Sequence, residues 1–262
     1  MSKNKVLFFD IDGTLWDSKS VIPESTVEAI KKLKENGHKT FINSGRSRGF
    51  IRDKKLLSLG FDGIVSACGT MIEMNNKVLF CREIDIDVVE KTLGVLKKYH
   101  FKPILEGKEY LYMDYDDFSD DVYGQKVMSD MGEFLRPISD SWNNWEICKF
   151  SCATDGTCLE DCFKELSDYY YFIVHNPKIV EFVPLGYSKG TGIEKTCECI
   201  GADIKDTFAF GDSVNDLEML KVSGTSIVMG NGSDDVKSIA DYVTTDLYDD
   251  GIWNACKYFG LI

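Results

Sequence analysis

From the first residues to about residue 70, the hydrophobic and polar positions alternate between a pattern typical of strands and one typical of helices. Apolar runs at residues 6–9, 39–42 and 63–67 have the length and composition of buried strands. Between them, residues 24–36 and 47–59 have the spacing of apolar positions that is typical of helices. Strands that alternate with helices predict βαβ units and a parallel sheet.

The pattern changes at about residue 71. Residues 71–81 predict a hairpin that turns at Asn75-Asn76, and residues 87–98 predict a helix. The further expected elements are short aromatic strands at 101–105, 109–113, 146–152 and 170–174 and a helix near 159–167. This mixed α+β pattern indicates a second structural part.

Strand and helix alternate again toward the C-terminal end. The expected elements there are helix 190–200, strand 207–210, helix 214–222 and strand 226–229. We therefore expect an α/β fold in which residues 1–81 and 184–262 form a core with a Rossmann-like parallel sheet. Residues 82–183 are expected to form an inserted α+β domain.

The composition limits the partners that the protein can have. The chain has 30 Lys and Arg residues and 43 Asp and Glu residues. The resulting formal net charge of −13 disfavours nucleic-acid binding. No apolar stretch approaches the roughly 20 residues that span a bilayer. The first five residues run directly into the first predicted strand, so we expect no signal peptide. We expect a cytoplasmic protein without a nucleic-acid or membrane partner, and nothing in the sequence indicates an obligate protein partner.

The cysteines indicate reduced thiols. Nine cysteines occur without a CxxC pair, and the chain has only three histidines, so a Cys/His zinc site is disfavoured. An odd number of cysteines without a leader peptide favours free thiols in the cytoplasm over a set of structural disulfides.

Two carboxylates follow the first predicted strand directly, in Asp10-Ile11-Asp12-Gly13-Thr14. Ligands of open α/β sheets bind just beyond the carboxyl ends of such strands. Two like charges about 4 Å apart cost roughly 4 kcal/mol at an effective dielectric constant of 20, unless a cation or a proton relieves them. This pattern suggests a nucleophile and an acid or base that act on an anion bound with a metal. A capped turn is the alternative, because Asp and Gly are ordinary turn residues.

Three further segments lie at the ends of predicted core elements. Ser44-Gly45 follows the second strand and could hold phosphate oxygens, or it could simply cap a helix. Lys189 lies at a helix start, where a lysine is unfavourable unless a negative group is near, although a solvated side chain is the simpler alternative. Residues 211–216, with Asp212, Asn215 and Asp216, offer hard oxygen ligands of the kind that Mg²⁺ prefers.

Together and in this order, these segments resemble the motifs of the haloacid dehalogenase (HAD) superfamily, and in particular its Cof-type phosphatases. The first to fourth motifs resemble, in turn, residues 10–14, Ser44-Gly45, Lys189 and residues 211–216. That subfamily carries a large α/β cap between its second and third motifs, where we place the insertion. One departure is Cys68-Gly69, where many relatives have Asn-Gly.

The resemblance implies a Mg²⁺-dependent phosphatase that hydrolyses small phosphate monoesters through an aspartyl-phosphate intermediate. It implies that Asp10 is the nucleophile and Asp12 the general acid and base. The implied metal ligands are the carboxylates of Asp10 and Asp212 and the main-chain carbonyl of Asp12, with Asp216 orienting water ligands or Lys189. The implied phosphate-binding groups are Ser44, Gly45, Lys189 and Asn215.

Other readings of the same residues remain open. A phosphomutase would need the same four motifs, and a non-catalytic protein that binds phosphorylated metabolites would retain the fold. The inserted domain would choose the leaving group, with sugar phosphates first and pyridoxal phosphate or a flavin-precursor phosphate next. Aromatic residues that either face the substrate or pack the inserted domain are Tyr110, Tyr112, Tyr115, Trp142 and Trp145.

Overall fold

The computed structural model of the protein describes residues 4–139 and 145–262. The chain divides into two compact units. The first unit comprises the residues up to Gly45, Asp53–Phe80 and Ser188–Ile262, and the second comprises Arg46–Arg52 and Cys81–Tyr187. The short segment that follows Ser44-Gly45 therefore belongs to the second unit, together with the long insertion.

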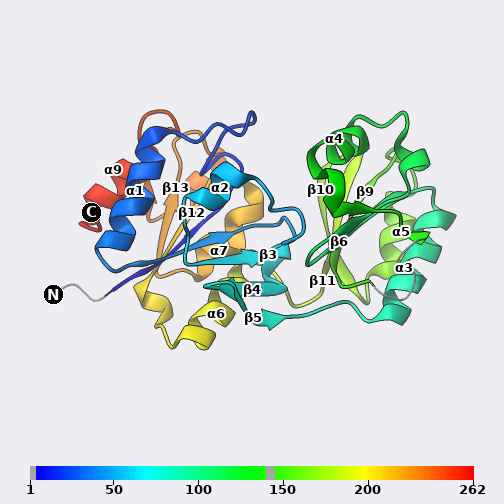
Figure 1. Ribbon diagram of the computed structural model, residues 1–262, viewed down its shortest axis with the longest axis horizontal. Helices are drawn as coiled ribbons and strands as arrows, with labels where there is room; N and C mark the ends of the chain where they lie inside the picture. The colour runs from blue at the N-terminus through cyan, green and yellow to red at the C-terminus, as the bar shows by residue number, and fades with distance from the viewer. Residues whose placement is uncertain (1–3, 140–144) are drawn as a thin grey trace. The chain divides into compact units, whose positions relative to one another are not determined.

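A mainly parallel sheet forms the centre of the first unit (Figure 1). Its strands are β1 (Val6–Phe9), β2 (Lys39–Asn43), β3 (Gly63–Ser66), β4 (Met71–Met74), β5 (Lys77–Cys81), β12 (Thr207–Gly211), β13 (Thr225–Val228) and β14 (Tyr242–Val243). The strand order is β14-β13-β12-β1-β2-β3-β4-β5. All pairs from β14 to β3 are parallel, and β3 pairs with β4 antiparallel. Every residue of β1 is buried, as expected for a central strand that is covered on both faces.

Helices cover this sheet. They are α1 (Glu24–Glu35), α2 (Lys54–Ser58), α6 (Lys189–Ile200), α7 (Leu217–Val222), α8 (Asp234–Lys237) and α9 (Gly251–Tyr258), with the 3₁₀ turns η1 (Ala67–Gly69), η5 (Ile204–Asp206) and η6 (Val214–Asp216). Ile193 of α6 and Met219 of α7 share one core cluster with Phe8 and Phe41 of the sheet. Helix α1 lies beside α9 (Figure 1). The site residues described below therefore rest on a packed α/β layer.

The helix predicted over residues 47–59 is much shorter in the structure, since α2 begins only at Lys54. Asp53 has extended backbone angles, and its carboxylate accepts hydrogen bonds from the N–H groups of Lys55 and Leu56 at 2.8 and 2.9 Å. An aspartate in this geometry is a helix N-cap, which fixes the start of α2. The residues before it belong to the second unit, where the N–H of Gly49 donates to the carbonyl of Gly107.

The second unit contains a sheet of its own. Its strands are β6 (Lys102–Gly107), β7 (Leu111–Tyr112), β8 (Leu135–Arg136), β9 (Ile147–Ala153), β10 (Tyr170–Asn176) and β11 (Ile179–Pro184), in the order β10-β11-β9-β6-β7-β8. Its helices are α3 (Ile86–Lys98), α4 (Val122–Met131) and α5 (Leu159–Leu166), with the 3₁₀ turns η2 (Tyr115–Phe118) and η3 (Gly132–Phe134). Except for the parallel pair β7–β8, the pairing is antiparallel. The expected α/β class is confirmed, with a parallel sheet in one part and an α+β arrangement in the other.

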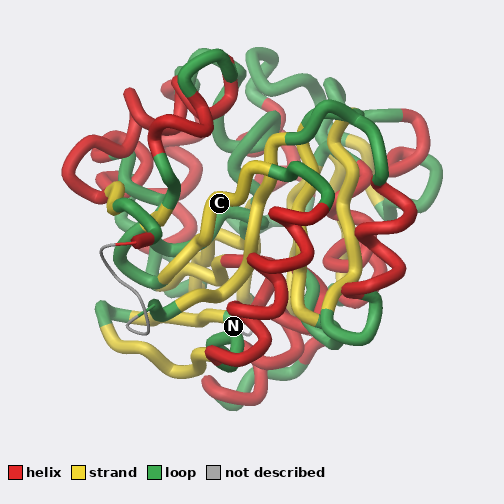
Figure 2. Tube along the Cα trace, turned by 90° about the vertical axis from the view of Figure 1, so that its right-hand side faces the viewer, coloured by secondary structure: helices red, strands yellow, loops and turns green. Residues whose placement is uncertain are grey.

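Both faces of the second sheet are packed. Phe150 of β9 lies in a cluster with residues of α3 and α5, whereas Ala153 lies in a cluster with Val127 of α4. Because neighbouring strand residues point to opposite faces, the two clusters cover opposite sides of the sheet. Figure 2 shows helical segments beside the strands throughout the described chain.

Packing accounts for two of the aromatic residues considered above. Tyr112 and Trp145 are buried in the cluster with α3 and α5, and Tyr110 packs against it. Tyr115 is partly exposed. Trp142 lies outside the described residues.

Among the residues that the structure describes, no helix is both long enough and apolar enough to cross a bilayer.

Candidate active site

Three loops emerge together at the carboxyl ends of β1, β2 and β12. Strand β1 pairs in parallel with both other strands, so that Phe9 lies opposite Ile42 of β2 and Phe210 of β12. Asp10, Ser44 and Asp212 therefore leave the sheet at the same edge. The strand order changes direction between β1 and β12, which is where open α/β sheets bind their ligands.

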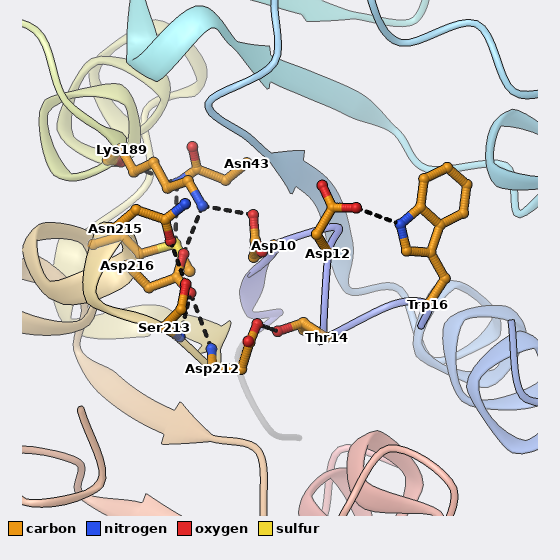
Figure 3. Close-up of polar contacts among 11 residues, drawn as sticks. Asp10, Asp12, Thr14, Trp16, Asn43, Lys189, Asp212, Ser213, Asn215 and Asp216 are labelled. Atoms are coloured by element: carbon orange, nitrogen blue, oxygen red, sulfur yellow. Dashed lines mark hydrogen bonds and ion pairs between the residues drawn. The ribbon is translucent and has the colours of Figure 1, made fainter. Parts of the chain in front are cut away.

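Lys189 reaches this edge from the first turn of α6. The Ser188 hydroxyl accepts hydrogen bonds from the N–H groups of the next turn and caps the helix. The Lys189 side chain is 2 % exposed, and its ammonium group lies 2.5 Å from Asp10 Oδ1 and 2.6 Å from Asp216 Oδ1 (Figure 3). These carboxylates supply the negative charge that a lysine at a helix N-terminus requires.

Asp216 holds several parts of the site together. Its Oδ1 accepts the hydrogen bond from Lys189, and its Oδ2 accepts from the N–H groups of Asp212 and Ser213 at 2.9 and 3.1 Å. Both carboxylate oxygens of this fully buried residue are thus engaged. This arrangement suits a residue that orients Lys189 and the loop after β12.

The loop after β1 contacts the loop after β12 directly. The Thr14 hydroxyl donates a hydrogen bond to Asp212 Oδ1 at 3.0 Å (Figure 3). Gly13 has φ +86°, and a Cβ atom there would lie 2.3 Å from Asp212 Oδ2. Glycine is therefore required both for the backbone conformation and for the close approach of the Asp212 carboxylate.

Burial and mutual repulsion raise the proton affinity of the carboxylates. Burial, with Asp216 and Asp212 nearby and Lys189 opposing, raises the pKa of Asp10 to about 8. Burial and then Asp216 raise the pKa of Asp212 to about 6. For Lys189, burial favours the neutral form, but Asp10 and Asp216 outweigh it and raise the pKa of the ammonium group. One lysine therefore only partly balances three carboxylates.

The same carboxylates fit a cation. Asp10, Asp212 and Asp216 each offer an oxygen, and these oxygens lie within 4.8 Å of one another. Carboxylate oxygens are hard ligands of the kind that divalent cations such as Mg²⁺ prefer. The side chains at positions 10 and 212 are thus close enough to contact one ion.

Asp12 is exposed and lies on the other side of the loop that follows β1. Its Oδ1 accepts a hydrogen bond from the indole Nε1 of Trp16 at 2.9 Å (Figure 3). Trp16 is buried. An exposed carboxylate that is oriented by a buried donor is suited to exchange protons with a bound molecule.

Ser44, Gly45 and Asn215 lie on the loops of the same unit. Ser44 is buried, its N–H donates to the Val65 carbonyl at 2.9 Å, and its carbonyl accepts from the Cys68 N–H at 3.1 Å. Asn215 is exposed in η6, and its Oδ1 accepts from the Ser213 hydroxyl at 2.6 Å (Figure 3). Their proposed contacts with phosphate stay predictions.

The Cys68 departure has a backbone consequence. Cys68 has φ 54° and ψ 40°, which is the left-handed helical region. Asn adopts this conformation more readily than other residues with a Cβ atom, apart from Asp. Asparagine would therefore suit the backbone of this loop better than Cys68, which is buried there.

Three residues of the site were not assigned roles from the sequence. Thr14 and Trp16 contact the acidic residues as described above. Asn43 is fully buried at the end of β2, where its Nδ2 donates to the Lys189 carbonyl at 2.9 Å and its Oδ1 has no hydrogen-bond partner. A polar residue directly after the predicted apolar strand 39–42 was the available signal for Asn43, whereas nothing local indicated the Trp16 contact.

Comparisons with known proteins agree with this geometry. Residues 7–256 match the family described as haloacid dehalogenase-like hydrolase. The protein YkrA of Bacillus subtilis (strain 168) is 32% identical over 279 aligned positions, and 5-amino-6-(5-phospho-D-ribitylamino)uracil phosphatase YitU of the same organism is 26% identical over 275; each alignment covers 99% of both chains. The solved structure of the HAD subclass IIB sugar phosphatase BT4131 superimposes with a TM-score of 0.82 at 27% identity, covering 99% of this chain and 100% of that one. Because the family match spans nearly the whole sequence, the chain belongs to the haloacid dehalogenase-like hydrolases.

Proposed function

We propose that this hydrolase cleaves small phosphate monoesters, with Asp10 as the nucleophile. The observation that carries the proposal is the buried Asp10 carboxylate at the end of β1, which lies 2.5 Å from Lys189 and has the oxygens of Asp212 and Asp216 within 4.8 Å. A carboxylate beside a fixed ammonium group and a candidate cation site suits attack on a phosphoryl dianion.

The reaction proceeds in two half-reactions. An Asp10 oxygen attacks phosphorus and forms an acyl-phosphate bond while the bond from phosphorus to the leaving oxygen breaks. Asp12 donates a proton to that oxygen and releases the alcohol. Asp12 then takes a proton from a water molecule whose oxygen attacks phosphorus, and the bond to Asp10 breaks. One water is consumed, inorganic phosphate is released, and both aspartates are restored.

Mg²⁺ is the cofactor that these donors favour. The carboxylates of Asp10 and Asp212 and the main-chain carbonyl of Asp12 would hold it, since all three offer hard oxygen atoms. When bound, the ion supplies positive charge that offsets repulsion between the carboxylates and the phosphate. Asp216 keeps its place as the partner of Lys189.

The remaining groups recognise the substrate. The Ser44 hydroxyl, the Gly45 N–H, Lys189 and Asn215 are proposed to bind phosphate oxygens, where negative charge spreads in the transition state. Residues 82–183 are proposed to act as a cap that selects the leaving group and excludes water.

The names of two relatives support a proposal for the substrate class. BT4131 is named as a sugar phosphatase and YitU as a phosphatase of a ribityl-uracil phosphate. Both leaving groups are polyhydroxylated. We therefore place sugar phosphates first and flavin-precursor phosphates and pyridoxal phosphate after them.

The thiols suggest where the reaction takes place. The exposed cysteines Cys158 and Cys199 have free thiols in the structure. Free exposed thiols persist in reducing compartments. We place the enzyme in the cytoplasm.

A phosphomonoester panel tests the proposal. Inorganic phosphate release is measured for sugar phosphates, nucleotide monophosphates, pyridoxal phosphate and a ribityl phosphate, with Mg²⁺ and with EDTA. We expect release that depends on the ion and is lost in Asp10→Asn. Absence of release from every ester would favour the alternative of a non-catalytic binding protein. Formation of an isomer of one hexose phosphate, in place of phosphate release, would favour a phosphomutase.

A further inference from the structure

A buried indole holds the exposed carboxylate of Asp12. The Trp16 Nε1 donates to Asp12 Oδ1 at 2.9 Å, and Trp16 is 3 % exposed. Figure 3 shows the Asp12 carboxylate turned toward this ring, while the Asp10 carboxylate is turned toward Lys189. The donor therefore lies on a fixed side chain and the acceptor on an accessible one.

The backbone of the loop fixes the distance between the two residues. The Gly13 N–H donates to the Trp16 carbonyl at 2.8 Å, and the Trp16 N–H donates to the Ile11 carbonyl at 3.2 Å. Asp12 and Trp16 are paired in an isolated bridge. Side chains from such a tight turn can meet only in a few orientations, so the contact between indole and carboxylate is set by the fold of the loop.

We propose that Trp16 is a positioning residue for the proton transfers of Asp12 and that it places the transferred proton on Asp12 Oδ2. This inference rests on the proposed function. An indole N–H can donate a hydrogen bond but cannot accept one. A carbonyl oxygen accepts such a bond more strongly than the oxygen of a carboxyl O–H group, so the indole bond to Oδ1 favours the protonated form that carries its proton on Oδ2.

The consequence can be followed through both half-reactions. In the first, the proton leaves Asp12 Oδ2 for the departing oxygen as the bond from phosphorus to that oxygen breaks. In the second, a water proton returns to Oδ2 as the water oxygen bonds to phosphorus and the bond to Asp10 breaks. Rotation of the carboxyl group would exchange its oxygens but would break the bond to Trp16. The hydrogen bond from the indole thus keeps Oδ2 as the oxygen that exchanges the proton.

The variant Trp16→Phe removes the N–H and keeps an aromatic ring. We expect kcat for an alkyl phosphate to fall about tenfold and KM to change by less than about twofold. A tenfold fall is smaller than the rate enhancement that a general acid and base usually supplies, because Asp12 itself is still present. Alcohol release in the first turnover should fall most for alkyl leaving groups and least for p-nitrophenol, which needs little protonation. The matched control is Trp253→Phe in α9, which should leave kcat unchanged.

A double-mutant cycle separates positioning from a merely structural role. Asp12→Asn can still accept the indole hydrogen bond through its amide oxygen, but it cannot transfer a proton. If Trp16 acts through Asp12, Trp16→Phe should have no further effect on kcat in the Asp12→Asn background. Thermal denaturation of each variant confirms that it is folded.

The outcomes distinguish the inference from the proposed function. The positioning role would be overturned if Trp16→Phe lowered kcat by a similar factor in the Asp12→Asn background. It would also be overturned if Trp16→Phe lowered kcat equally for alkyl and p-nitrophenyl esters. No loss in Trp16→Phe would overturn it as well. An Asp12→Asn variant with full activity would instead overturn the proposed acid and base.

Discussion

The ammonium group of Lys189 lies 2.5 Å from Oδ1 of Asp10, although the two residues are 179 positions apart in the sequence. Both are buried. Burial is the main reason that the pKa of Asp10 rises to about 8, and Lys189 opposes this rise. We therefore expect removal of the Asp10 charge and removal of the Lys189 charge to have opposite effects on the stability of the fold.

Replacement of Asp10 should separate activity from stability. In Asp10→Asn the nucleophile is lost, so phosphate release should fall to background. The variant also loses repulsion with Asp216 and Asp212, while Lys189 keeps its contact with Asp216. Without metal, its thermal midpoint should equal or exceed that of the unchanged protein, as is common when an active site is neutralised. Retained turnover would show that another group attacks phosphorus.

Replacement of Lys189 should weaken the fold. Lys189→Met leaves the buried Asp10 and Asp216 carboxylates without their cation, and breaking a buried pair in this way typically costs about 3–5 kcal/mol. Urea denaturation in the absence of metal measures the loss.

The same helix provides the control for that experiment. Lys195 of α6 forms an exposed pair with Glu198 at 2.7 Å, and such pairs contribute about 0–1 kcal/mol. Lys195→Met should therefore change the free energy of unfolding little. Equal losses in the two variants would mean that the charge of Lys189 is not what stabilises the site.

Metal binding should stabilise the native state through Asp212. An ion that binds only the folded protein adds about 2.7 kcal/mol at a concentration one hundred times its dissociation constant. Titration with Mg²⁺ should raise the thermal midpoint, EDTA should reverse the rise, and Asp212→Asn should abolish it. Asp161→Asn, at an exposed position of α5, should retain the full shift. A shift that persists in Asp212→Asn would place the ion elsewhere.

The features that the sequence predicts well are those encoded by neighbouring residues. The buried run before Asp10 and the one before Asp212 each combine an apolar strand with an acidic turn, and both strands form as expected. Of the two interpretations of Lys189 at a helix start, the structure supports negative neighbours and not a solvated side chain.

Features that depend on distant parts of the chain were not predictable. The role of Asn43 arises from the Lys189 carbonyl, which lies 146 positions away. The helical pattern of residues 47–59 was misleading, because residues before Asp53 contact the second unit instead of extending α2. The Trp16 contact depends on how the turn after Asp12 closes, which hydrophobic periodicity does not describe.

Acid should weaken the second unit through Glu181. Burial alone would raise the pKa of Glu181, but the ion pair with Lys149 and the contact with His175 at 2.9 Å together lower it to about 2. Because the folded-state pKa lies below the unfolded value of about 4.5, the stabilisation is complete above pH 4.5 and is lost as the pH falls toward 2. A shift of this size corresponds to about 3 kcal/mol.

Chemical denaturation across that range tests the assignment. The difference in unfolding free energy between the unchanged protein and Glu181→Gln should be largest near neutral pH and should shrink between pH 4.5 and 2. Glu165→Gln, which removes an exposed pair with Lys98, should show a much smaller dependence. A difference that stays constant down to pH 2 would contradict the role of Glu181.

Replacement of Cys68 should stabilise the protein, because its left-handed backbone conformation is unfavourable for most residues. With φ 54°, Cys68→Asn should recover part of the roughly 1–2 kcal/mol that this conformation costs, since Asn hydrogen-bonds locally there. We expect a gain of up to about 1 kcal/mol and a thermal midpoint higher by about 2–4 °C. Cys68→Ser is the matched control, because serine is similar in size and polar but lacks the preference of asparagine. The Cys68 N–H donates to the Ser44 carbonyl in either case, so phosphate release should not change. A loss of stability in Cys68→Asn and a gain in Cys68→Ser would mean that side-chain volume in this buried loop outweighs the backbone preference.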